Sequence, residues 1–203
     1  MAYVLINHGW TNHRPQGHWQ RLTAAALRAQ GHTVAYPQYP SPDQPKFSEW
    51  SALLGAELEL LAEARVLAGG TGEFVVLAHS LGCVTWLKSA IDGLLPESIK
   101  PDRLLLVAPA ANEMLDPIPD FKVDLKAPGA AEAARKSAGQ ITLVGSDRDV
   151  WTPQGVQHHF GEPLALEAVT IFGAKHLALG DGWGNWQGVV NWVNDASADL
   201  TVR

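Results

Sequence analysis

The chain has 203 residues, of which 46% are hydrophobic and 18% charged, and this composition is typical of a globular protein rather than a disordered one. Its formal net charge of −6 gives no support for binding nucleic acid or an anionic membrane, since both need clustered Lys and Arg. The lone Cys83 excludes an internal disulfide and fits a reducing compartment. We expect a single domain spanning residues 1–203.

The N-terminal segment has no basic stretch, and its apolar run is too short for a signal peptide. No segment approaches the roughly 20 apolar residues that span a bilayer. These two observations predict a cytoplasmic protein that has no membrane partner.

Short apolar runs alternate with longer amphipathic segments, and a Pro- and Ala-rich stretch at 110–139 predicts a loop with one short helix. In chain order the pattern predicts strand Ala2–Ile6, helix Trp19–Gln30, strand Thr33–Tyr36, helix Phe47–Leu67, strand Phe74–Ala78, helix Leu81–Leu94, strand Arg103–Ala108, strand Gln140–Val144, helix Pro153–Phe160, strand Leu166–Phe172 and helix Gln187–Ala196. This alternation predicts an α/β fold, a compact three-layer αβα arrangement around a mostly parallel six-stranded sheet, with no separate lid domain.

The sharpest local signal is Ala78-His79-Ser80-Leu81-Gly82, which stands between a buried strand and a helix. A turn this tight forces strained backbone angles on its central residue, so the residues two before and two after it must be small. The turn would lift Ser80 to the N-terminus of the helix as a nucleophile, and the Leu81 N–H would face developing negative charge. The alternative is that Ser80 only caps the helix.

A nucleophilic serine needs a general base, and the base needs an acid that orients it. Asp147 and Asp149 follow the fifth predicted strand, and His176 follows the sixth. An acid and a histidine at successive strand ends, in the order Ser, Asp, His, rarely occur together by chance. The residues alone leave the choice between the two acids open.

Other histidines give weaker signals. His8, His13 and His18 recur every five residues in one loop region, but no cysteine joins them and the spacing matches no helical ligand pair. We therefore expect no metal and no other cofactor.

Several motifs together resemble a family of small serine hydrolases related to retinoblastoma-binding protein 9 and the bacterial YdeN-like proteins. The similar parts are the Ala-His-Ser-Leu-Gly turn, Gly17-His18-Trp19-Gln20, the loop Gly145–Asp149 and the Gly/Trp stretch Gly180–Trp186. The likeness runs over nearly the whole chain and implies the α/β-hydrolase fold. Two positions depart from the family pattern, because Val150 stands where Pro is usual and Lys175 where Gly is common.

The resemblance implies roles for further residues. Counting from Ser146 in its Ser-x-x-Asp pattern selects Asp149 as the acid, and Asp147 would instead cap the following turn. A second oxyanion donor is implied in the loop after the first strand, where Gly9 permits close approach and Trp10 offers its N–H. His8 would stabilise this loop or lie satisfied in the core.

The resulting prediction is a carboxylesterase-like serine hydrolase that forms an acyl-enzyme on Ser80, with His176 and Asp149 completing a triad. The chain has eight Trp residues, and those near the proposed triad suggest an aromatic rim around a small ester substrate. The residues we assign to the substrate pocket are Gly9, His79, Trp151 and Trp183. The alternatives are a protein-interaction module on a hydrolase scaffold and an amidase or peptidase that uses the same triad. A protein partner is compatible with the sequence but not indicated by it.

Overall fold

A computed structural model describes residues 1–203 and contains one six-stranded sheet. All its strand pairs are parallel, and the strand order is β2-β1-β3-β4-β5-β6. The strands are β1 Ala2–Asn7, β2 Thr33–Ala35, β3 Glu73–His79, β4 Arg103–Val107, β5 Gln140–Gly145 and β6 Ala168–Thr170. The sequence predicted a mostly parallel sheet, and the sheet is entirely parallel.

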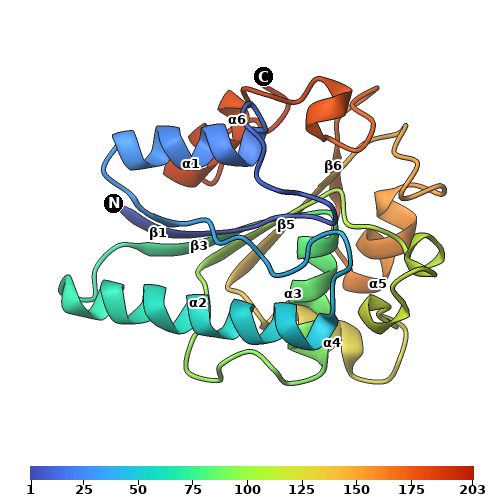
Figure 1. The fold of residues 1–203 in the computed structure, drawn as a ribbon, viewed down its shortest axis with the longest axis horizontal. Helices are drawn as coiled ribbons and strands as arrows, with labels where there is room; N and C mark the ends of the chain where they lie inside the picture. Colours follow the sequence, from blue (N-terminus) through green and yellow to red (C-terminus); the bar gives the residue numbers. More distant parts are fainter.

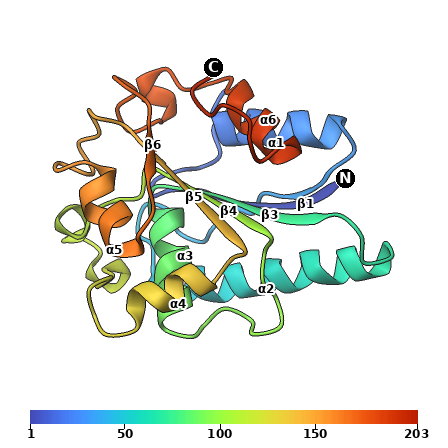
Figure 2. The same ribbon diagram turned by 180° about the vertical axis from the view of Figure 1, so that it is seen from behind.

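Helices cover both faces of this sheet, which gives the three layers that the sequence predicted (Figures 1 and 2). The helices α1 (Trp19–Ala29) and α6 (Gln187–Asn194) pack together on one face. On the other face lie α2 (Phe47–Leu67), α3 (Leu81–Ile91) and α4 (Ala130–Lys136). The short α5 (Glu162–Leu164) contacts α4.

Each face of the sheet carries its own hydrophobic core. A cluster of 30 buried residues lies under α2, α3 and α4, and a cluster of 23 lies under α1 and α6. Side chains alternate between the two faces of a strand, so a strand covered on both faces must be apolar throughout. This explains why the central strands β3 and β4 read as continuous apolar runs in the sequence.

The helix α3 ends at Ile91 and not at Leu94 as the sequence predicted. Gly93 has a φ of +68°, a left-handed conformation that glycine adopts at little cost. The N–H of Leu94 then turns back to the carbonyl oxygen of Ser89 at 2.8 Å, which closes the helix in a Schellman-type cap.

The segment from 153 to 172 also departs from its predicted boundaries. The expected helix Pro153–Phe160 is replaced by a wider π-type turn, Gln157–Gly161, which continues into α5. The strand β6 is three residues long rather than extending over Leu166–Phe172. It lies at the edge of the sheet with one neighbour, and the side chain of Phe172 is 83% exposed. The apolar residues that predicted a longer strand therefore belong to an edge strand and its flanks, which are only partly covered.

The predicted loop at 110–139 contains one α-helix, α4, as expected, together with two short 3-10 turns, Asn112–Leu115 and Pro119–Phe121. No helix in the chain combines the length and apolarity needed to cross a bilayer.

Parallel strands all end at the same edge of their sheet. Ser80 follows β3, Asp149 lies in the loop after β5, and His176 lies in the loop after β6. The fold therefore brings these three residues to one edge although 96 positions separate the first from the last in the chain.

Candidate active site

Ser80 stands at the sharp turn between β3 and α3. Its φ of +53° and ψ of −120° are strained for any residue with a side chain, and its N–H donates to the carbonyl oxygen of Val107 at 2.9 Å. Gly82 allows the turn to pack closely, since a Cβ there would lie 2.7 Å from the carbonyl oxygens of Asn7 and His8. The requirement for a small residue at this position therefore comes from the loop after β1, which lies directly against α3.

A continuous chain of hydrogen bonds joins Ser80, His176 and Asp149. The distance from Ser80 Oγ to His176 Nε2 is 2.8 Å, and His176 Nδ1 lies 2.9 and 2.8 Å from the two carboxylate oxygens of Asp149. The carboxylate is fully buried, and its Oδ1 also accepts from the N–H of Trp151 at 2.9 Å. With Nδ1 donating to Asp149, the free Nε2 lone pair faces the Ser80 hydroxyl.

The structure separates Asp147 from Asp149, the acid that the family pattern selected. Asp147 Oδ1 accepts from the N–H of Gly173 at 2.6 Å, and this bond ties the loop after β5 to the loop after β6. Asp147 does not contact His176, whereas Asp149 contacts it through both oxygens.

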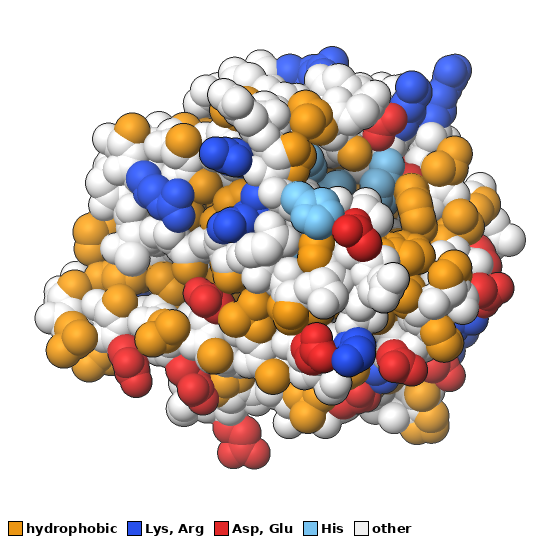
Figure 3. Space-filling model, in the orientation of Figure 1, with side chains coloured by type: hydrophobic (Ala, Val, Ile, Leu, Met, Phe, Trp, Pro, Cys, Tyr) orange, Lys and Arg blue, Asp and Glu red, His pale blue; other side chains and the backbone are white.

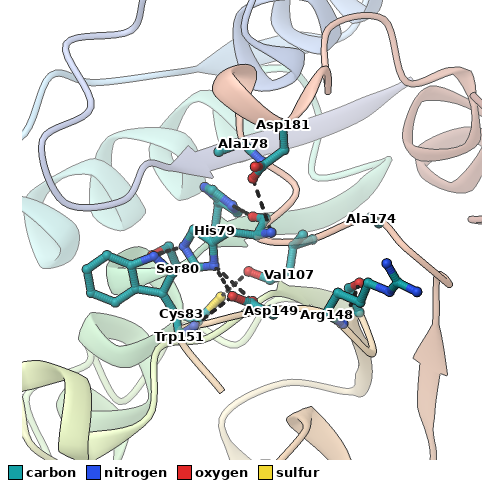
Figure 4. A network of polar contacts seen from close by, with 12 residues as sticks. His79, Ser80, Cys83, Val107, Arg148, Asp149, Trp151, Ala174, Ala178 and Asp181 are labelled. Carbon is teal, nitrogen blue, oxygen red and sulfur yellow. Dashed lines mark hydrogen bonds and ion pairs between the residues drawn. The ribbon is translucent and has the colours of Figure 1, made fainter. Parts of the chain in front are cut away.

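Side chains from two other segments hold the backbone of His176 in place (Figure 4). Its N–H donates to Asp181 Oδ2 at 3.1 Å, and its carbonyl oxygen accepts from His79 Nε2 at 2.9 Å. The flanking Lys175 and Leu177 both have left-handed backbone, with φ of +54° and +55°. Sequence reasoning missed Asp181, and its only signal was its place in the Gly/Trp stretch that follows the histidine.

The loop after β1 packs directly against Ser80. A Cβ on Gly9 would come within 2.9 Å of the Ser80 Cβ, so only glycine fits there without a shift. The backbone N–H of Trp10 donates to no acceptor within the protein, whereas its indole N–H donates to the carbonyl oxygen of Asp43 at 3.4 Å. Leu81 is the first residue of α3, where N–H groups have no intrahelical acceptor. These are the two N–H groups that the sequence indicated as oxyanion donors.

His8 fixes the shape of this loop. Its Nε2 accepts from the N–H of Tyr39 at 2.9 Å, so Nδ1 carries the proton and donates to the carbonyl oxygen of Gly9 at 2.8 Å. Burial lowers the pKa of His8 from 6.5 to about 4, which keeps the ring neutral. The sequence left two roles open for His8, loop stabilisation and core packing. Its hydrogen bonds to Gly9 and Tyr39 and its full burial show both.

A cavity of about 470 Å³ opens above Ser80 and His176. Its volume lies in the range of small-molecule sites. The apolar part of its lining includes Trp10, Trp151, Leu115 and Leu179. Gly9 and His79 also line it, and His18 does so although the sequence did not place it there.

Trp183 was predicted at the substrate pocket, and this prediction is wrong for the cavity above Ser80. The Trp183 side chain is buried in the core under α1 and α6, and its indole N–H donates to the carbonyl oxygen of Ala174 at 3.0 Å. Gly182, with a φ of +85°, turns the chain inward directly before it. Nearness to His176 in sequence therefore did not place Trp183 at the site.

The histidines near the N-terminus do not assemble into a metal site. His13 is exposed and pairs with Asp43 at 3.0 Å, whereas His18 caps α1 by accepting the N–H of Gln20 on its Nδ1. No group of three or more His, Cys, Asp or Glu side chains is placed to hold a metal ion. Cys83 is fully buried in the core rather than at the cavity.

Comparison with known protein families gives one match, to a family model described as serine hydrolase, over residues 4–195. The chain has no significant match among curated protein sequences.

Solved structures with the same fold were found at low sequence identity. The YdeN gene product from Bacillus subtilis is 18% identical, with 96% of this chain and 97% of that chain covered and a TM-score of 0.75. A YdeN-like hydrolase from Pectobacterium atrosepticum is 18% identical, with 100% and 94% covered and a TM-score of 0.64. A monoacylglycerol lipase from Paleococcus ferrophilus is 16% identical, with 96% and 94% covered and a TM-score of 0.59. At such identities the likeness shows the fold.

Proposed function

The chain belongs to the serine hydrolase family and has the α/β-hydrolase fold, and from this premise we propose that it cleaves small esters through an acyl-enzyme on Ser80. The observation that carries the proposal is the hydrogen-bond chain from Ser80 Oγ through His176 to the buried Asp149, with distances of 2.8 to 2.9 Å. Residues 1–203 act as one domain in this proposal, because all six strands lie in one sheet.

In the proposed reaction His176 Nε2 takes the proton from the Ser80 hydroxyl as its oxygen attacks the ester carbonyl. Asp149 holds the ring in the required tautomer and stabilises the imidazolium. The N–H groups of Trp10 and Leu81 stabilise the oxyanion, and each contributes roughly 3 kcal/mol by comparison with single-donor deletions. His176 then gives the proton to the leaving alcohol, which leaves the acyl group on Ser80. In the second half of the reaction His176 activates a water molecule, which hydrolyses the acyl-enzyme and releases the carboxylic acid product.

The cavity supports a small substrate with an apolar acyl or alcohol group. Trp10 and Trp151 meet edge to face at 6.1 Å, and Trp151 also lies 5.5 Å from the His176 ring. The two indoles form an apolar wall beside the proposed nucleophile. The similar structure from Paleococcus ferrophilus is named a monoacylglycerol lipase, and we extend ester cleavage to this chain as part of the proposal.

Labelling with a fluorophosphonate probe tests the nucleophile, because such probes react with activated serines. We expect labelling of the wild type and none of Ser80→Ala. Labelling that persists in the variant would assign the nucleophile to another residue. If neither protein is labelled although both are folded, the interaction-module alternative is favoured.

A substrate panel tests the bond type. We expect hydrolysis of p-nitrophenyl acetate and butyrate, slower hydrolysis of the octanoate, and no release from an aminoacyl-p-nitroanilide. Faster cleavage of the anilide than of the short esters would assign the enzyme to amides.

The choice of acid is tested by a matched pair of variants. Asp149→Asn should lower kcat roughly 10³- to 10⁴-fold, because an amide cannot hold the imidazole in the correct tautomer. Asp147→Asn keeps the oxygen that accepts from Gly173 and should change kcat by less than about tenfold. Ester hydrolysis under saturating substrate is the measurement, and equal losses in the two variants would refute the assignment of Asp149.

A further inference from the structure

A second cavity, of about 250 Å³, lies over α1 and the edge strand β2. Three arginines line it, together with His13, Ala24 and Tyr36. Figure 3 shows Lys and Arg side chains gathered over α1, on a face that also exposes histidine side chains. We call this cavity the arginine groove and define it by Arg14, Arg21, Arg28 and Tyr36.

The arginines of the groove are held in a row by backbone carbonyls. Arg21 and Arg28 are seven residues apart on α1, which places them on one side of the helix about 10 Å apart. Arg28 donates to the carbonyl oxygen of Val34 at 2.8 Å, Arg14 to that of Tyr36 at 2.6 Å, and Arg21 to that of Arg14 at 2.9 Å. Arg14 also donates to Gln38 Oε1 at 3.2 Å, and because each guanidinium has five N–H donors, each of the three keeps donors beyond these bonds.

No carboxylate neutralises these three charges. None of the three arginines takes part in an ion pair, although the chain as a whole carries a net charge of −6. The acid beside the groove, Asp43, pairs with His13 at 3.0 Å. The groove is therefore a local concentration of positive charge on an acidic protein.

Tyr36 adds a donor that has no partner. Its side chain is 8% exposed, and its buried hydroxyl makes no hydrogen bond in the protein. Burial raises the pKa of this hydroxyl far above its usual value, and the charges of Arg14 and Arg21 only partly oppose the rise. The group is therefore a neutral O–H close to two guanidinium groups. An unsatisfied buried donor costs free energy, and no acceptor within the protein offsets this cost.

The segment that carries Arg14 separates the groove from the cavity above Ser80. Asn12 and Pro15 line the catalytic cavity, whereas His13 and Arg14 line the groove. Arg14 has a φ of +52°, a left-handed conformation that is unfavourable for residues with a side chain and that is common at binding sites. Protection of the β2 edge would account for the contacts of Arg14 and Arg28, but it explains neither Arg21 nor the unpartnered Tyr36 hydroxyl.

We propose that the arginine groove binds a phosphate group, whose oxygens match the planar donors of arginine in pairs. Two sources share this chemistry. One is a phosphate group on the substrate that is cleaved at Ser80, and this source rests on the proposed function. The other is a free phosphate or pyrophosphate.

The first experiment measures pyrophosphate binding by isothermal titration calorimetry at pH 7 and low salt. The Ser80→Ala variant serves as the parent protein, so the result is independent of hydrolysis. We expect binding that weakens at least about tenfold in Arg21→Gln/Arg28→Gln and weakens with added NaCl. Arg135→Gln, which removes the same charge from the exposed surface of α4, should change the Kd less than twofold.

The single variant Arg21→Gln controls for misfolding, because the only hydrogen bond of this side chain goes to the carbonyl oxygen of Arg14. Its Kd should lie between those of the parent and the double variant, at an unchanged Tm. Absence of binding to the parent, or equal binding to the double variant, would overturn the proposal. So would an equal loss of affinity in Arg135→Gln, because the effect would then depend on net charge alone.

A second experiment identifies the source of the phosphate. It compares hydrolysis of neutral p-nitrophenyl acetate with that of acetyl-coenzyme A, a thioester whose leaving group carries phosphates. A loss of kcat/KM of about tenfold in Arg21→Gln/Arg28→Gln for the thioester alone assigns the groove to the substrate. Pyrophosphate binding without such a difference assigns it to a free phosphate. If the wild type hydrolyses neither the ester nor the thioester, the proposed function is contradicted. The binding of pyrophosphate measured by calorimetry would still stand, because it does not depend on hydrolysis.

Discussion

At the scale of single residues, the backbone around His176 carries a cost that glycine would remove. Lys175 has a φ of +54°, and its side chain pairs only weakly with Asp181, at 4.0 Å and largely exposed. A left-handed conformation costs an L-residue roughly 1–2 kcal/mol. This explains in physical terms why glycine is common before the histidine in the family that the sequence resembles.

Replacing Lys175 therefore tests the strain directly. Lys175→Gly should raise the free energy of unfolding by about 0.5–1 kcal/mol, because relief of the strain exceeds the entropy that glycine adds to the unfolded chain. Lys175→Ala removes the same ion pair but keeps the strain, so its stability should stay near that of the wild type. Urea unfolding measures both variants. If Lys175→Gly is no more stable than Lys175→Ala, the claim that the backbone at Lys175 is strained is refuted.

At the scale of elements, His79 connects the end of β3 to the loop after β6. It precedes Ser80 in the turn, and its Nε2–H donates to the carbonyl oxygen of His176. The ring is nearly inaccessible to solvent, and burial holds its pKa well below the usual value, so it stays a neutral donor. We therefore propose that His79 is a positioning residue, which sets where the proposed base His176 lies relative to Ser80, the residue that follows His79 in the chain.

His79→Ala should lower kcat about 10- to 100-fold with little change in KM, because a base displaced by about 1 Å loses its alignment with Ser80. His79→Gln offers an amide N–H in place of the imidazole N–H and should recover part of the loss. Steady-state ester hydrolysis and thermal unfolding are the measurements. A kcat within twofold of the wild type in folded His79→Ala, or no recovery in His79→Gln, would contradict the positioning role.

At the scale of the whole molecule, the buried histidines make stability depend on pH. Burial lowers the pKa values of His8 and His18 to about 4, against about 6.5 in an unfolded chain. Between these values the unfolded state binds more protons than the folded state. Stability is therefore fully present above pH 6.5 and falls as the pH drops toward 4.

We expect protonation of each of these two histidines to lower the free energy of unfolding by about 2 kcal/mol when the pH falls from 7 to 5. His18→Asn keeps a hydrogen-bond acceptor at the start of α1. In this variant the fall in the free energy of unfolding between pH 7 and pH 5 should be about 2 kcal/mol smaller than in the wild type. His158→Asn, at an exposed position, is the control and should leave the difference between the two pH values unchanged. Urea unfolding at both pH values is the measurement. Identical losses in wild type and His18→Asn would contradict the assignment.

Local patterns in the sequence determined the architecture and the positions from which the candidate site is built. The helix α2 has the predicted bounds because its apolar residues repeat at helical spacing over 21 residues. The continuous apolar runs of β3 and β4 predicted strands covered on both faces, and the fold class and the resemblance to YdeN-like hydrolases are confirmed. The turn at Ser80 could be predicted for the same reason, since steric crowding at Ala78 and Gly82 acts over a few residues.

Only the tertiary structure decided which of these residues meet. The spacing of the family pattern selects Asp149, but its contact with His176 depends on how the loops after β5 and β6 lie against each other. The same holds for Trp183, which points into the core. It holds also for Asp181 and His79, which bind the backbone of His176 from two segments far apart in the chain. Steric limits within a turn and the periodicity of apolar residues depend on residues that are close in sequence. These contacts instead form only when parallel strands bring distant loops to one edge of the sheet.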